Sequence, residues 1–218
     1  MEKLLLAGAV LALGVGTAQA QRVGVRGGVN LANQEQRIFG QNVENEQITQ
    51  YHVGLTSELE LNDNFALRPE LLFSRKGSNF SAALPNVVTF DTEDRLSYLT
   101  LPVTLAFKAE LGPGKVLVGA GPYAGLLLGG RRKETGSVLG VSGSRTRDIA
   151  IGNNEADDYK SLDAGVNFQA GYEFTDQIFL VGNYGLGLVD VQANGDDNNY
   201  RRTRCFELSV GAYLTNAK

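Results

Sequence analysis

The stretch from Leu96 to Lys108, LSYLTLPVTLAFK, decides the fold of this chain. From Leu99 to Phe107 every second residue is large and apolar, and the residues between them are smaller or polar. A period of two is typical of a β-strand that has one apolar face and one polar face. The stretch therefore predicts a strand, and the question it raises is which of the two faces meets water.

Seven other stretches show the same alternation of apolar residues with polar or small ones. They lie at residues 23–31, 51–61, 65–74, 116–128, 162–174, 178–190 and 205–214. Short alternating runs separated by turn residues are typical of an all-β sandwich or barrel. We therefore expect an all-β fold of eight antiparallel strands.

The connections between these stretches are alternately long and short. Short turns are expected at 62–64, 112–114 and 175–177, and long polar loops at 34–49, 78–94, 131–158 and 194–202. In an up-and-down meander this alternation places every long loop at one end and both termini at the other. Bacterial outer-membrane barrels have this asymmetry, with short periplasmic turns and long extracellular loops. The sequence thus predicts an eight-stranded, up-and-down transmembrane β-barrel.

The N-terminus has the pattern of a secretory signal peptide. Lys3 precedes an apolar run from Leu4 to Val15, and Ala18-Gln-Ala20 is a small-x-small cleavage site. The run is shorter than the roughly 20 residues that a membrane-spanning helix needs. We expect residues 1–20 to be a signal peptide and residues 21–218 to form one barrel domain.

The composition argues against several functional classes. The 218 residues carry a net charge of −4, whereas nucleic-acid-binding domains are usually basic, so no nucleic-acid partner is expected. Cys205 and His52 are the only cysteine and the only histidine, which leaves no cysteine or histidine cluster for a metal and no internal disulfide. We expect no catalytic residue, no metal site and no cofactor.

Charged residues on the polar face indicate which side of the sheet closes inward. Both signs of charge occur there, and a closed barrel allows them to pair where isolated buried charges would be costly. The side chains expected to line the lumen are Arg26, Glu58, Glu60, Arg68, Glu70, Lys108, Asn167, Glu173 and Glu207. Phe65, Phe107 and Phe174 flank the short turns on the apolar face, where the aromatic belt of a lipid-facing barrel would lie.

A soluble, lipocalin-like barrel in the periplasm is the alternative. It would show the same alternation but would turn its apolar face inward around a small apolar ligand. The many glycines and charges on the polar face favour a narrow polar lumen instead. Because side chains fill the interior of an eight-stranded barrel, we expect at most a very narrow conductance.

The sequence also resembles a known family. The stretches that carry the resemblance are Gly24–Leu31 (GVRGGVNL), Gly54 with the strand that follows it, Arg68–Gly77 (RPELLFSRKG), Tyr98–Val103 (YLTLPV) and Gly119–Gly125 (GAGPYAG). They are similar to those of the PorT-like, porin-family outer-membrane β-barrel proteins common in the Bacteroidetes lineage. The resemblance implies an eight-stranded outer-membrane barrel with little chemistry. Most such proteins have no assigned activity, and a few are tied to protein secretion or maturation at the cell surface.

Together these patterns predict a non-enzymatic integral barrel of the bacterial outer membrane. Its long loops are expected to reach an unidentified protein partner at the surface or to serve as an accessory in export. Outer-membrane lipid would surround the barrel, and the basic residues 131–133 and 201–202 are placed to contact anionic lipopolysaccharide. The acidic loops 153–158 and 194–199 lack the spacing of a calcium-binding loop.

Overall fold

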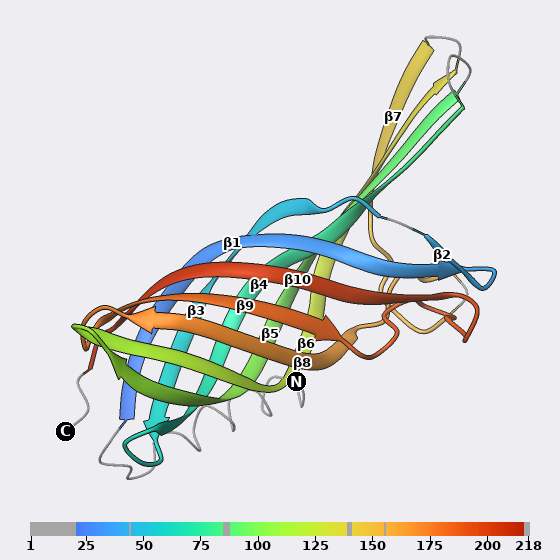
Figure 1. Ribbon diagram of the computed structural model, residues 1–218. Helices are drawn as coiled ribbons and strands as arrows, with labels where there is room; N and C mark the ends of the chain where they lie inside the picture. Colours follow the sequence, from blue (N-terminus) through green and yellow to red (C-terminus); the bar gives the residue numbers. More distant parts are fainter. Residues whose placement is uncertain (1–20, 44, 85–87, 139–140, 155, 216–218) are drawn as a thin grey trace.

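The structure is a computed structural model that describes residues 21–43, 45–84, 88–138, 141–154 and 156–215. These residues form ten strands in one antiparallel sheet that curves back on itself (Figure 1). The strands are β1 (Gln21–Ile38), β2 (Gln41–Val43), β3 (Ile48–Glu60), β4 (Phe65–Leu84), β5 (Val88–Leu111), β6 (Gly114–Val138), β7 (Val141–Asp148), β8 (Leu162–Glu173), β9 (Ile178–Gly187) and β10 (Tyr200–Tyr213). Within the described ranges no helix is long and apolar enough to cross a membrane.

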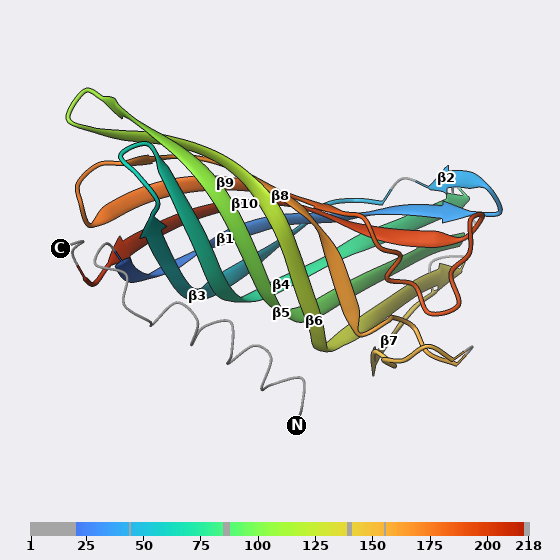
Figure 2. The same ribbon diagram turned by 90° about the horizontal axis from the view of Figure 1, so that it is seen from below.

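The sheet closes into a barrel because its first and last strands pair. β1 and β10 run antiparallel, from Gly24 opposite Tyr213 to Arg37 opposite Tyr200. The order around the ring is β1-β3-β4-β5-β6-β8-β9-β10, while β2 pairs with β1 and β7 with β6 outside it (Figure 2). Closure gives every ring strand two neighbours, which removes the open edges that a sheet would otherwise expose.

The long connections differ from the sequence-based expectation. Within 78–94 the described residues are strand and not loop, because β4 continues to Leu84 and β5 begins at Val88. Much of the described part of 131–158 is strand as well, because β6 continues to Val138 and β7 follows. The expected strand count was eight, and the described residues form ten because β2 and β7 arise within segments expected to be loops. The outer parts of β4, β5 and β6 form with β7 a sheet that leaves the ring as a narrow ribbon (Figure 1). The residues of β7 are nearly all exposed on both faces, so no apolar alternation distinguishes this strand from a polar loop.

The short turns lie where the sequence places them. They connect β3 to β4, β5 to β6 and β8 to β9. In the first, Asn62 Oδ1 accepts hydrogen bonds from the backbone N–H of Asn64 at 3.0 Å and of Phe65 at 2.9 Å. In the second, Gly112 has φ of 63°, a left-handed conformation that glycine adopts without strain.

The apolar face of the strand that contains Leu99–Phe107 points out of the barrel. Leu105 and Phe107 are 47% and 41% exposed, whereas Thr104 and Lys108 on the other face are 0% and 5% exposed. The same outward apolar pattern is found at Val25, Val29, Val53, Leu55, Val118, Phe168, Leu180, Phe206, Leu208 and Val210. A lipocalin-like barrel would have the opposite arrangement, so the structure gives no support to the soluble alternative.

Candidate functional site

The short-turn end of the lumen is filled by an ion-pair cluster centred on Glu58. Glu58, on β3, is fully buried and accepts hydrogen bonds from Arg22 and from Lys108 Nζ, the latter at 2.7 Å. The hydroxyl of Tyr213 donates to the same carboxylate at 2.8 Å, and Arg68 Nε lies 3.6 Å from it. The period-two alternation of five different strands points these side chains at one another.

Further ion pairs extend this cluster along the lumen. Lys108 Nζ lies 2.9 Å from Glu173, and Arg26 lies 3.3 Å from Glu70 and 3.4 Å from Glu207. The buried charges of the Glu58 cluster are Arg22, Arg26, Arg68 and Lys108 on one side and Glu58, Glu70, Glu173 and Glu207 on the other. These cations and carboxylates balance, which limits the free-energy cost of burying them in a closed lumen.

Neutral hydrogen bonds occupy the middle of the lumen. His52 Nδ1 lies 2.6 Å from Asn30 Oδ1, and its Nε2 lies 2.7 Å from Ser209 Oγ. Asn30 in turn donates to Ser74 at 2.9 Å. Both imidazole nitrogens are thus engaged by side chains of the barrel wall, while the buried thiol of Cys205 faces a backbone carbonyl oxygen at 3.8 Å. The geometry is that of a packed interior.

Another cluster of polar side chains lies closer to the long-loop end. Asp163 accepts hydrogen bonds from Thr203 Oγ1 at 2.8 Å and from the Tyr123 hydroxyl at 3.3 Å, and Lys76 Nζ lies 5.1 Å from the centre of the Tyr123 ring. The cavity between this group and the Glu58 cluster has a volume of ≈ 20 Å³. That space holds about one water molecule. In the part of the chain that the structure describes, the lumen is therefore packed with side chains.

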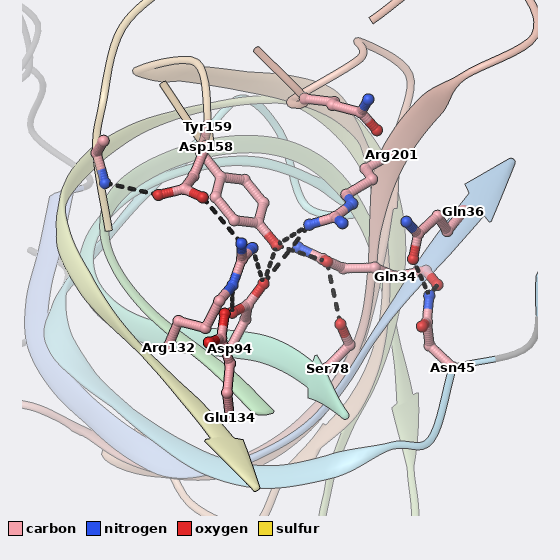
Figure 3. A network of polar contacts seen from close by, with 12 residues as sticks. Gln34, Gln36, Asn45, Ser78, Asp94, Arg132, Glu134, Asp158, Tyr159 and Arg201 are labelled. Atoms are coloured by element: carbon pink, nitrogen blue, oxygen red, sulfur yellow. Dashed lines mark hydrogen bonds and ion pairs between the residues drawn. The ribbon is translucent and has the colours of Figure 1, made fainter. Parts of the chain in front are cut away.

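Tyr159 covers the lumen at the long-loop end. It comes from the segment between β7 and β8, is fully buried, and places its hydroxyl 2.7 Å from Asp94 and 3.0 Å from Gln34 (Figure 3). Arg201 Nη1 donates to the same hydroxyl at 2.9 Å. Burial, reinforced by Asp94, raises the pKa of Tyr159 to about 12, so the hydroxyl stays protonated and donates to Asp94.

Asp158, the neighbour of Tyr159, fixes this segment to the mouth of the barrel. It accepts hydrogen bonds from Arg147 at 2.6 and 2.7 Å and from the backbone N–H of Ala150 at 2.9 Å. Arg132 donates a further hydrogen bond to it at 2.8 Å (Figure 3). Arg132 also donates two hydrogen bonds of 2.7 Å to Asp94. The hydrogen bonds from Arg147, with those from Ala150 and the charge of Arg132, lower the pKa of Asp158 to about 2. We call Asp94, Arg132, Asp158, Tyr159 and Arg201 the mouth layer.

The structure brings most of the predicted lumen residues together. Those that are buried in the lumen are Arg26, Glu58, Arg68, Glu70, Lys108, Asn167, Glu173 and Glu207. Glu60 is exposed, because β3 ends there and the adjoining turn opens to solvent, so its placement in the lumen is corrected. Phe65, Phe107 and Phe174 are 41%, 41% and 50% exposed on the outer surface. The rings of Phe65 and Phe107 lie 5.4 Å apart.

The mouth layer was not found from the sequence. Arg132 and Arg201, expected on a basic rim, both contact Asp94 instead. One signal was present in the sequence, since Tyr159 is the only aromatic residue between Tyr123 and Phe168. A lone aromatic side chain in a polar segment often marks the point at which that segment packs against the rest of the protein.

Comparisons with known proteins identify a family. A family model described as "Outer membrane protein beta-barrel domain" matches residues 17–193. A search of curated proteins found no match.

Several solved structures of outer-membrane proteins are similar to this chain. Ail of Yersinia pestis, in complex with the heparin analogue sucrose octasulfate, is 12% identical with a TM-score of 0.44, over 89% of this chain and 99% of that chain. Neisserial surface protein A is 14% identical with a TM-score of 0.42, over 88% and 95%. OprG from Pseudomonas aeruginosa is 11% identical with a TM-score of 0.36, over 89% and 96%. At these identities and TM-scores, the functions of those proteins cannot be assigned to this chain.

Proposed function

The chain belongs to the outer membrane protein β-barrel family, and we propose that it is a non-enzymatic integral barrel that conducts no solute and presents its long-loop end outside the cell. The observation that carries the proposal is the Glu58 cluster, which fills the lumen at the short-turn end. A solute crossing there would have to separate buried ion pairs, and breaking one such pair costs about 3–5 kcal/mol. The packed lumen therefore supports a barrel that acts as a membrane anchor and scaffold.

The unequal lengths of the strands support a platform outside the membrane. A tilted strand crosses the bilayer with about 9–11 residues. β9 has 10 residues, whereas β5 has 24 and β6 has 25. We propose that the eight ring strands cross the membrane and that the surplus of β4, β5 and β6 joins β7 in an extracellular sheet. Phe65, Phe107 and Phe174 would then form the aromatic belt at the periplasmic interface.

The partners proposed for this barrel follow from its two surfaces. Outer-membrane lipid would cover the apolar outer face. Of the basic residues expected at the rim, Arg131 is 76% exposed and Lys133 is also exposed, so these two are the ones placed to contact the anionic groups of lipopolysaccharide. The extracellular sheet offers the surface for a protein partner.

A finer assignment, to the PorT-like group with an accessory role in export, rests on the sequence stretches that carry the resemblance. Their inward side chains include Arg26, Arg68, Glu70 and Tyr123, all buried in the lumen. Part of the resemblance therefore lies in residues that pack the interior. Residues 1–20, proposed as a cleaved signal peptide, lie outside the described residues.

Planar-bilayer recording of the refolded barrel tests the proposal. Folding is checked first by faster gel migration without boiling, and the barrel should sediment with the outer membrane. The wild-type barrel should then show no discrete conductance steps, while a Glu58→Ala/Arg68→Ala variant, which clears the centre of the Glu58 cluster, should show them. Steps of equal size in both proteins would overturn the proposal, as would release of the wild-type chain into the soluble periplasm.

A further inference from the structure

A cavity of ≈ 290 Å³ lies at the long-loop end, beside the mouth layer. Its lining comes from β1, β4, β5, β6, β10 and the segment after β2, and it includes Asn45, Phe80, Phe90, Arg132, Glu134 and Arg201. Drug-sized ligands occupy cavities of about 300–1,000 Å³. This cavity, which we call the mouth cup, therefore suits a ligand of one or two rings.

The charges of the mouth cup balance one another. Arg132 donates two hydrogen bonds to Asp94, and Arg201 Nη1 lies 3.5 Å from the same carboxylate. With Glu134 included, two cations face two carboxylates in the lining. An ionic ligand would lose its hydration without meeting a net opposite charge, so the cup favours a neutral one.

Polar groups with hydrogen-bonding capacity remain at the wall of the mouth cup. Arg147 is the cation that contacts Glu134, with 3.9 Å between Arg147 Nε and Glu134 Oε1. The short hydrogen bonds of the Arg147 guanidinium go to Asp158 instead. A distance of 3.9 Å is longer than a hydrogen bond, so the Glu134 carboxylate can accept hydroxyl donors. Asn45 on the opposite wall is anchored through its Nδ2, which donates to the Gln34 carbonyl at 2.8 Å (Figure 3).

Two phenylalanines supply an apolar wall beside these polar groups. Phe80 is opposite Thr92 and Phe90 is opposite Ala82 in the β4–β5 pairing, so the two rings are diagonal neighbours on one face of the sheet. Phe90 remains 43% exposed, and both rings line the cup. The face of an aromatic ring is electron-rich and attracts the weakly positive C–H groups of a neighbouring molecule.

We propose that the mouth cup binds a neutral saccharide of one or two rings. Such a molecule has C–H groups on one side for Phe80 and Phe90, and hydroxyls that donate to Glu134 and accept from the Arg132 and Arg201 guanidinium groups. The proposal does not depend on whether the lumen conducts, because the cup lies at the long-loop end and shares no lining residue with the Glu58 cluster.

Saturation-transfer NMR with the barrel refolded in lauryldimethylamine oxide tests this proposal, since that detergent has no sugar headgroup. The probes are methyl α-glucopyranoside, methyl β-galactopyranoside, methyl α-mannopyranoside, N-acetylglucosamine and lactose. At least one should receive saturation from the protein. Phe90→Ala and Glu134→Gln should each weaken that binding about tenfold, which corresponds to the loss of one stacking or hydrogen-bond contact.

Matched control variants separate the mouth cup from a general effect. Phe39→Ala removes a ring that is 88% exposed in the β1–β2 turn, and Glu93→Gln changes a carboxylate on the other face of β5. Neither should change binding, and all four variants should keep the heat-dependent gel shift. Displacement of the bound probe by dextran would identify the end of a glycan chain as the ligand, and retention of the probe would identify a free sugar. Three results would overturn the proposal. They are no saturation transfer to any of the sugars, an equal loss of binding in the control variants, and binding of butylammonium instead of a sugar in a way that depends on Glu134.

Discussion

Replacing Glu58 with Gln tests the packing of the lumen most sharply. The substitution keeps the size of the side chain but removes the charge that holds Arg22, Arg68 and Lys108. Glu173 then remains as the carboxylate in contact with Arg22 and Lys108. Breaking a buried ion pair by removing one partner costs about 3–5 kcal/mol, so we expect Glu58→Gln to lower the free energy of unfolding by that amount.

Urea unfolding in phospholipid vesicles, followed by heat-dependent gel mobility, measures this loss. The matched control is Glu60→Gln, at an exposed residue of the same strand, which should change the free energy of unfolding by less than about 0.5 kcal/mol. Lys108→Met combined with Glu58→Gln removes one of the stranded cations. The double variant should be more stable than the sum of the two single losses by about 0.5–3 kcal/mol. Equal midpoints for Glu58→Gln and Glu60→Gln, or a strictly additive double variant, would refute the reasoning.

Three further predictions concern the mouth layer and the barrel wall. Tyr159→Phe removes the hydroxyl that donates to Asp94 and should lower the free energy of local opening of this segment by about 1–3 kcal/mol. Hydrogen exchange should therefore accelerate in residues 149–161 and not in the ring strands. Because the pKa of Asp158 is lowered from 3.8 to about 2, its stabilising contribution is present above about pH 4 and lost as the pH falls toward 2. ¹³C NMR of its carboxyl should give a midpoint near 2, and a midpoint near 4 would contradict the hydrogen bonds that Arg147 donates to it. A Cβ at Gly54 would lie 2.1 Å from the Leu71 carbonyl oxygen, whereas a Cβ at Gly27 would have its nearest contact at 3.4 Å. Gly54→Ala should therefore lower the free energy of unfolding by about 1–3 kcal/mol and Gly27→Ala by much less. Similar urea midpoints for the two variants would contradict this prediction.

The strands of the ring could be predicted because the two environments of a barrel wall impose a period of two. Leu105 and Phe107 must face outward if Thr104 and Lys108 face inward, and the structure has this arrangement. The segment that forms β7 carries no such signal. Its residues, Val141–Asp148, are nearly all exposed on both faces, so no apolar alternation marks them as strand.

Side-chain positions at the ends of the lumen depend on more than alternation. Glu60 has the inward parity of Glu58 but lies where β3 ends, and strand parity alone does not indicate where the lumen stops. Tyr159 meets Asp94 across 65 residues of sequence. Such a contact is set by how a connecting segment folds back over the barrel, which local propensity does not determine.

Fluorescence quenching by lipids with brominated acyl chains tests the central claim most directly, namely that the apolar face meets lipid. The chain contains no tryptophan, so a single introduced tryptophan reports one position. Phe107→Trp and Val118→Trp, on the outer face, should be strongly quenched in the folded barrel, and Phe39→Trp, in the exposed β1–β2 turn, should not. A folded barrel in which Phe107→Trp and Val118→Trp are no more quenched than Phe39→Trp would contradict the account.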